Sequence, residues 1–122
     1  MSKEIEVISI NGVDYVKKDA IKNYPVKDGL KYSIVRTYSA GVFAGYIESQ
    51  NGQEVTMVNA RRLWQWAGAA SLSPFAMEGT SAPKSCKFPC EVDRVKLMQA
   101  IEILDATTKC KETIDSVPVW KV

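Results

Sequence analysis

The sequence predicts a single α+β domain, in which an antiparallel β-meander sheet is accompanied by an N-terminal hairpin and two or three short helices. Asn-Gly pairs at 11–12 and 51–52 lie between runs of β-branched and aromatic residues, the strongest short signal for a hairpin. Cap residues and glycines bracket short segments with helical spacing beyond residue 58. A chain of 122 residues has the size of one domain. We divide it into a hairpin and arm over residues 1–29, packed on or beside a core of residues 30–122.

The N-terminal segment predicts two strands, Ile5–Ile10 and Val13–Val16, around an Asn11-Gly12 turn of type I′. A lysine-rich segment follows and contains a proline and a glycine. It predicts a short helical turn over Asp19–Asn23 and then a loop.

The meander is predicted from three consecutive runs that carry β-branched and aromatic side chains. Turn residues at 39–41 and 51–52 separate them. Since alternate residues of a strand point to opposite faces, one face of this sheet is expected to be packed. The predicted strands are Leu30–Tyr38, Val42–Ser49 and Gln53–Val58.

Two short helices are predicted after the meander. Asn59 resembles an N-cap for a helix over Ala60–Ala67 that ends near Gly68. The apolar residues that recur there at helical spacing are expected to face the sheet. They are Leu63, Trp66, Ala67 and Ala70. A second helix is predicted to begin at Ser73-Pro74 and to stop at Gly79.

The last third of the chain predicts an irregular connection, a strand, a helix and an extended tail. Two prolines mark Thr80–Glu91 as irregular. Apolar residues of one parity favour a strand over Val95–Ile103, although Met98–Leu104 could also be helical. Thr107 or Thr108 caps a helix that runs to about residue 115, and Pro118 extends the tail.

Charge and composition limit the classes of partner. The net charge is only +2, from 16 basic and 14 acidic residues, so any anion site must be local. No segment approaches the ~20 apolar residues of a membrane span, and the N-terminus begins with alternating charges. We expect a cytoplasmic protein.

The residues that usually carry catalysis or bind metal are sparse. The three cysteines, Cys86, Cys90 and Cys110, are odd in number and are expected to be reduced thiols. The sequence has no histidine, so it lacks both the usual general base and a common zinc ligand. It also has no glycine-rich phosphate loop and no motif that pairs two carboxylates. We therefore expect no cofactor, no metal and no enzymatic activity.

Three arginines are the candidate anion ligands. Arg61 and Arg62 fall in the first turn of a predicted helix, where the macrodipole disfavours cations. They need either an ion pair with Glu48 or Glu54 or a bound anion such as phosphate. Arg36 shares strand parity with apolar residues and so needs a partner or a place at the rim of the sheet.

Several aromatic rings could stack on a planar ligand, although most are expected to pack in the core. Trp64 lies off the apolar stripe of the predicted helix and should be exposed beside the arginine pair. We take Tyr38 and Trp64 as the candidate stacking or interface residues. The other rings considered are Tyr32, Phe43 and Trp120.

Four strings in the chain resemble a family of short proteins that tailed bacteriophages and prophages carry, usually described as a domain of unknown function. The resemblance runs from about Tyr32 to the C-terminus, and its most specific strings are Arg-Thr-Tyr-Ser-Ala-Gly and Ala-Arg-Arg-Leu-Trp. The strings are Arg36–Ile47, Asn59–Leu72, Ala100–Ile103 and Val117–Val122.

This resemblance implies a phage accessory protein that acts in the host cytoplasm. In size and setting it is similar to the Thoeris anti-defence sponges, small oligomers that sequester a cyclic nucleotide signal. The expected function is to sequester a small phosphate-bearing ligand as a homo-oligomer. The alternatives are inhibition of a host defence protein and, third, binding of nucleic acid.

Overall fold

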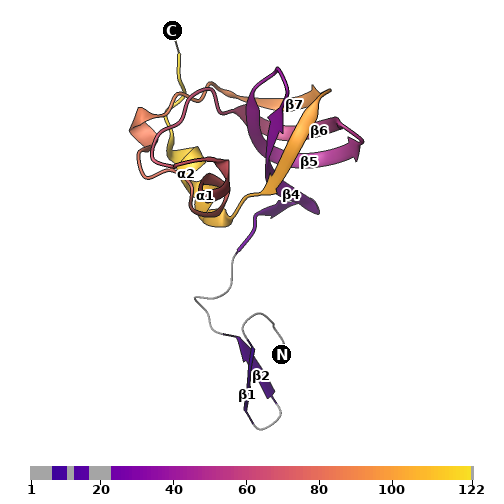
Figure 1. The fold of residues 1–122 in the computed structure, drawn as a ribbon, viewed down its shortest axis with the longest axis vertical. Coiled ribbons are helices and arrows are strands. Elements are labelled where there is room, and N and C mark those ends of the chain that lie inside the picture. The colour runs from indigo at the N-terminus through magenta and orange to yellow at the C-terminus, as the bar shows by residue number, and fades with distance from the viewer. Residues whose placement is uncertain (1–6, 11–12, 17–22, 122) are drawn as a thin grey trace.

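The computed structural model describes residues 7–10, 13–16 and 23–121 and has the predicted α+β class. Strands β1 (Val7–Ile10) and β2 (Val13–Val16) pair antiparallel as a separate two-stranded sheet (Figure 1). The predicted strand start at residue 5, the turn at 11–12 and the helical turn over residues 19–22 lie outside the described residues.

The main sheet has six strands and contains the predicted meander. Its order is β3-β4-β5-β6-β7, and β8 pairs with β4. The expected loop near Pro25 instead forms strand β3, because Asp28 and Gly29 both adopt positive φ and close a tight turn. The strands are β3 (Val26–Lys27), β4 (Leu30–Thr37), β5 (Val42–Asn51), β6 (Glu54–Arg62), β7 (Glu91–Leu97) and β8 (Ala100–Asp105).

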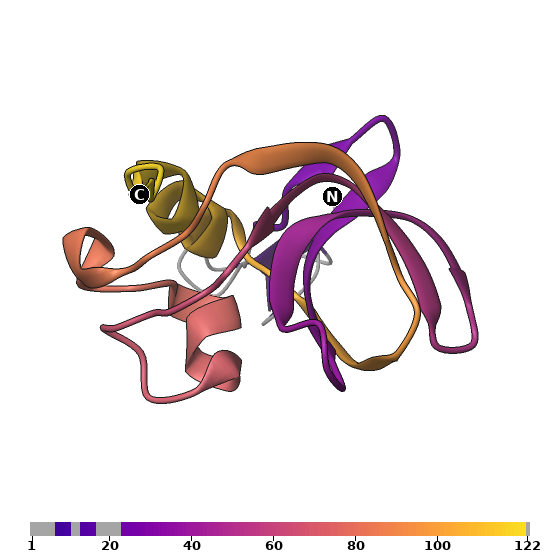
Figure 2. The ribbon, with the colours of Figure 1, turned by 90° about the horizontal axis from the view of Figure 1, so that it is seen from above.

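The main sheet curls strongly, as Figure 2 shows. Strands β7 and β8 are joined by only Met98 and Gln99, yet β7 pairs with β6 and β8 pairs with β4. The prediction of one strand over Val95–Ile103 is therefore wrong in number, although the strand conformation was right. One core cluster fills the inside of the curl with residues from all five strands β4 to β8: Val35, Phe43, Val55, Met57, Ala60, Leu97 and Ala100.

Helices α1 (Leu72–Glu78) and α2 (Thr108–Ser116) belong to a second core cluster with the other face of β4 and β5. Helix α1 begins after Ser71, two residues earlier than predicted, and ends at Gly79 as predicted. The Thr107 hydroxyl caps α2 by accepting a hydrogen bond from the Cys110 N–H at 3.1 Å. It also donates to the Met77 carbonyl at 2.7 Å, which joins the two helices.

The predicted helix over Ala60–Ala67 is wrong, because strand β6 continues to Arg62 and residues 63–70 contain no helix. Asn59 is not a helix cap. It has φ of 50° at an irregularity where Ala44 pairs with Arg61 and Tyr46 pairs with Val58. Gly45 lies opposite, and a Cβ there would come within 2.8 Å of the Ala60 Cα.

A single-turn 3₁₀ helix, η2 (Pro83–Ser85), interrupts the connection between α1 and β7. After α2 the tail is extended, as was predicted from the presence of Pro118. Its Trp120 N–H donates to the Phe88 carbonyl at 2.9 Å. Within the part of the chain that the structure describes, no helix has both the length and the apolar character needed to cross a membrane.

Candidate functional site

Arg61 is a buried cross-link between segments far apart in the chain. Its side chain is 8% exposed, and its guanidinium donates five hydrogen bonds to backbone carbonyls at 2.8 to 3.1 Å. Burial lowers the pKa of Arg61 from its ordinary value. The five acceptors leave little of this group for a ligand, so we leave Arg61 out of the candidate site. The acceptor carbonyls belong to Phe88, Pro89, Ile114, Val117 and Pro118.

Arg36 has the partner that its position on the sheet requires. Its Nε lies 3.0 Å from Oε1 of Glu102 on the adjacent strand β8. Both side chains are exposed, so the pair is screened by solvent. The ion pair predicted between the Arg61-Arg62 pair and Glu48 or Glu54 does not form among the described residues, since Glu48 binds Arg94 and Glu54 lies 3.7 Å from Lys96.

Arg62 and Trp64 lie together in a surface hollow of about 410 Å³, which we call the Arg62 site. Strand β6 ends at Arg62, and the chain continues extended, so that both side chains line the hollow from one segment. The turn between β4 and β5 provides the opposite wall. The lining residues are Ser39, Ala40, Gly41, Val42, Arg62, Leu63, Trp64 and Trp66.

The turn that walls the Arg62 site is fixed by Thr37. The Thr37 hydroxyl donates to the Gly41 carbonyl at 2.7 Å and accepts from the Ala40 N–H at 2.9 Å. Gly41 has φ of 96°, a conformation that side chains other than that of glycine rarely adopt. The Tyr38 N–H donates to the Gln99 carbonyl at 2.9 Å, which ties the turn to the β7–β8 connection. The wall is therefore preorganised.

The charge of Arg62 is compensated by an aromatic face and one carbonyl. Its Cζ lies 4.3 Å from the centroid of the Phe43 ring, and Nη1 donates to the Ala40 carbonyl. None of the ion pairs in residues 7–10, 13–16 and 23–121 includes Arg62. The lining residues that the structure describes also include no carboxylate. The site can thus accept an anion without displacing a charged partner.

Trp64 is exposed, as predicted, and is part of an aromatic stack that the sequence did not reveal. Its ring lies parallel to that of Trp120, with 6.2 Å between centroids and 7° between planes. The Lys87 Nζ lies over the Trp120 ring at 5.8 Å. Trp64 is 60% exposed and Trp120 is 38% exposed, so both rings remain accessible. The prediction that Trp64 is exposed is confirmed, but the argument for it was wrong, because the helix on which it relied does not form.

Tyr38 directly precedes the wall of the Arg62 site, but its ring does not line the hollow. The side chain is 77% exposed. Of the five residues singled out from the sequence, the structure therefore brings Arg62 and Trp64 together in one hollow. Arg36, Tyr38 and Arg61 lie outside it.

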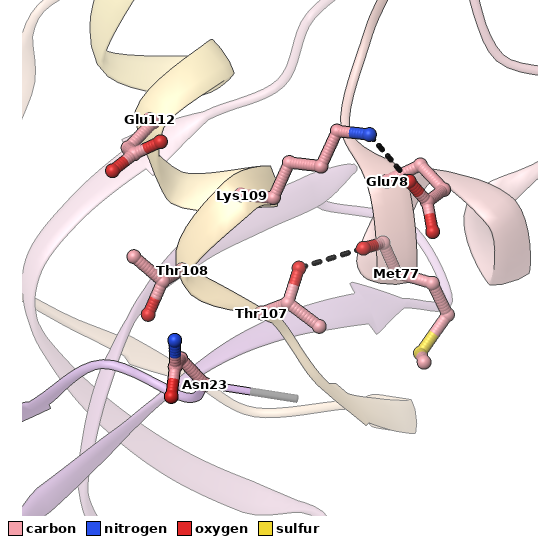
Figure 3. A pocket seen from close by; sticks show the side chains of 7 residues that line it. All are labelled: Asn23, Met77, Glu78, Thr107, Thr108, Lys109 and Glu112. Atoms are coloured by element: carbon pink, nitrogen blue, oxygen red, sulfur yellow. Dashed lines mark hydrogen bonds and ion pairs between the residues drawn. The ribbon is translucent and has the colours of Figure 1, made fainter. Parts of the chain in front are cut away.

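A second hollow of about 410 Å³ lies where α1 meets the start of α2 (Figure 3). Its lining includes two carboxylates, Glu78 and Glu112, and Lys109 lies 2.7 Å from Glu78. The Thr107 hydroxyl is occupied by its bond to Met77, which Figure 3 shows. With paired charges and helix-packing bonds, this hollow is less suited to an anion than the Arg62 site.

Asn59 serves the sheet and not a helix. Its side chain accepts a hydrogen bond from Lys27 Nζ at 2.6 Å and donates to Glu91 Oε2 at 3.1 Å. The three cysteines are free thiols, of which only Cys90 is exposed. Among the described residues, no three cysteines or carboxylates are grouped so that they could hold a metal ion.

A family model described as a domain of unknown function, DUF6948, matches residues 30–114, which is more than half of the chain. The matched segment includes Arg62 and Trp64 and ends before Trp120. Neither the curated proteins nor the solved structures contain a match to the chain.

Proposed function

The chain belongs to the DUF6948 family of unknown function, and we propose that it binds a small phosphate-bearing ligand with a planar ring at the Arg62 site. The observation that carries the proposal is that one hollow is lined by an exposed tryptophan and by a guanidinium that has no carboxylate partner among the described residues. Arginine N–H groups match phosphate oxygens, and an exposed indole stacks on a nucleotide base.

The lining favours binding over catalysis. Besides Arg62, the described residues of the lining offer only the Ser39 hydroxyl and the indole N–H groups as polar side-chain groups. None of these lining residues is a carboxylate, lysine or cysteine that could act as a general base or nucleophile. We therefore propose a binding protein and not an enzyme.

The resemblance to phage accessory proteins suggests a setting for this binding. In that setting the protein would sequester a nucleotide-like signal of host immunity in the cytoplasm of an infected bacterium. It would act as a homo-oligomer, as such sponges do. This role extends the proposal and depends on the ligand being a nucleotide.

Calorimetric titration with adenosine 5′-monophosphate, ribose 5-phosphate and adenosine tests the proposal. We expect the monophosphate to bind more tightly than either fragment, because only it has both the phosphate and the ring. Arg62→Gln should weaken the binding roughly 10-fold or more, the value of one charge-assisted hydrogen bond. The matched control is Arg36→Gln, which removes an exposed arginine outside the hollow and should change affinity less than about 2-fold.

Equal losses of affinity in the Arg62 and Arg36 variants, or no binding at millimolar nucleotide, would contradict the proposal.

A second candidate function, docking on a host defence protein, is favoured by the exposed tryptophan pair. It predicts that tagged protein retains one host protein in stoichiometric amount. Trp64→Ala should release that protein whether or not nucleotide is present.

A further inference from the structure

The surface next to the Arg62 site is both aromatic and basic. Three segments, residues 62–66, 84–88 and 119–121, meet there through backbone bonds. Gln65 and Lys87 exchange N–H···O bonds at 3.2 and 2.7 Å, and Phe88 forms a bridge with Val119. These segments contain four cations and no acidic residue: Arg62, Lys84, Lys87 and Lys121. We call this surface the basic aromatic face.

The charges of this face are available to a ligand. Lys84, Lys87 and Lys121 are exposed, and Arg62 is half-buried. None of the four takes part in the ion pairs of the described part of the chain. The face thus carries four positive charges, more than the net charge of +2 of the whole chain, and includes two exposed parallel indoles.

Each ring of the tryptophan stack has a cation near it. Arg62 shares its hollow with Trp64, whereas Lys87 lies over the ring of Trp120. Lys87 is not among the described residues that line the hollow of Arg62. Alternation of cations and stacking rings is typical of surfaces that follow a sugar–phosphate backbone.

We propose that the basic aromatic face binds a ligand in which phosphates flank a nucleoside on both sides, one phosphate at Arg62 and the other at Lys87. This inference rests on the proposed function and narrows its ligand class. The same unit occurs in a free dinucleotide and within a single strand of nucleic acid, so the test distinguishes these sources.

The test compares the affinities of adenosine 5′-monophosphate, adenosine 3′,5′-bisphosphate, a 5′-phosphorylated diadenylate and a ten-nucleotide oligoadenylate, by quenching of tryptophan fluorescence. We expect the bisphosphate and the diadenylate to bind about 10-fold more tightly than the monophosphate. If the oligoadenylate binds about as tightly as the diadenylate, the ligand is a small molecule. If it binds a further 10-fold or more tightly, the ligand is a strand.

Lys87→Gln separates the second phosphate contact from the first. It should reduce the affinity for bisphosphate to that for monophosphate and leave monophosphate binding unchanged. It should also lower the salt dependence of diadenylate binding by about one phosphate contact. Lys96→Gln, a lysine on β7 close to Glu54, is the control and should change none of these values.

Two failures are distinguishable. If the monophosphate binds through Arg62 but the bisphosphate gains nothing and Lys87→Gln has no effect, the extended ligand class is wrong and the proposed function stands. If none of the four compounds binds, both fail. Melting temperatures of the variants, expected within a few degrees of wild type, confirm that each is folded.

Discussion

Arg61 and Arg62 are neighbours in the chain, but their guanidinium groups lie in opposite environments. In an extended strand, successive side chains point to opposite faces. Arg61 therefore points into the protein, where five carbonyls receive it, and Arg62 points into a surface hollow. The first stabilises the fold, and the second is available for binding.

This contrast predicts different outcomes for the same substitution. Arg61→Lys should lower the free energy of unfolding by roughly 3 kcal/mol, because one ammonium cannot satisfy five carbonyls that a planar guanidinium reaches. Arg62→Lys should change it by less than about 1 kcal/mol, since it loses only one backbone bond and a ring contact. Urea denaturation of both variants measures the difference. Equal losses of stability would show that Arg61 is not the cross-link described.

At the level of elements, the end of strand β6 stands where the sequence predicted the start of a helix over Ala60–Ala67. Leu63, Trp66 and Ala67 have helical spacing, and Asn59 has the chemistry of an N-cap. Strand β6 nevertheless continues to Arg62, because β7, some 30 residues later, pairs with its outer edge up to Arg61. The spacing of neighbouring residues in the sequence cannot predict a pairing between strands that lie so far apart in the chain. By contrast, helices α1 and α2 were predicted near their observed positions, because the residues that mark their ends are local in sequence: Gly79 ends α1 and Thr107 caps α2.

Asn59 contributes to strand β6 through its backbone conformation, which most other residues adopt only at a cost. Its φ of 50° is accessible to asparagine and glycine but costs other residues about 1 kcal/mol or more. Asn59→Val should therefore lower the free energy of unfolding by about 2 kcal/mol. Asn59→Gly should cost less, because it loses only the exposed bonds to Lys27 and Glu91. If valine is no more damaging than glycine, the side-chain bonds that both variants lose, and not the backbone conformation, determine the effect.

The aromatic stack was missed for a similar reason. Sequence reasoning identified Trp64 as exposed and Trp120 as a possible stacking ring, but the two are 56 positions apart. They meet because Pro118 extends the tail and the Trp120 N–H bonds to Phe88. Non-local backbone bonds of this kind decide which surface residues become neighbours. The sequence therefore predicts the types of side chain at the site, an arginine and exposed aromatic rings, but it does not predict which of these residues lie together.

At the scale of the whole molecule, the curled sheet has a core on each face. Strands β4 and β5 contribute side chains to both, since Val35 and Phe43 point into the curl while Ile34 and Ala44 face the helices. The helix-side core also encloses Cys110 and Tyr32, whose titration burial suppresses. Burial raises the pKa of the Cys110 thiol to about 12, and burial, with Asp115 as the next cause, raises the pKa of Tyr32.

These shifts predict that the protein loses stability in alkali. The unfolded chain releases the thiol proton near pH 9 and the phenol proton near pH 10, while the folded chain retains both. The contribution of each group is therefore complete below its unfolded pKa and declines above it. The free energy of unfolding should fall above pH 9, by at most about 1.4 kcal/mol per pH unit for each group.

Urea denaturation between pH 7 and pH 11 under reducing conditions measures this decline. Cys110→Ala should flatten the curve between pH 9 and pH 10, whatever its effect on stability at pH 7. Tyr38→Phe removes an exposed phenol and should leave the curve unchanged. A decline of equal slope in the cysteine variant would assign the alkaline transition to other groups.

The carbonyls that receive Arg61 also set an order of events during synthesis. Three of them, those of Ile114, Val117 and Pro118, follow β8 in the sequence, and strand β8 pairs with β4 across about 70 positions. A nascent chain that has extended only through β7 lacks three of the five carbonyls that receive Arg61 and lacks strand β8, the partner of one edge of β4. The Arg61 cross-link is thus completed only after residues 114–118 have left the ribosome, and a ribosome stalled before residue 117 holds an unfinished core.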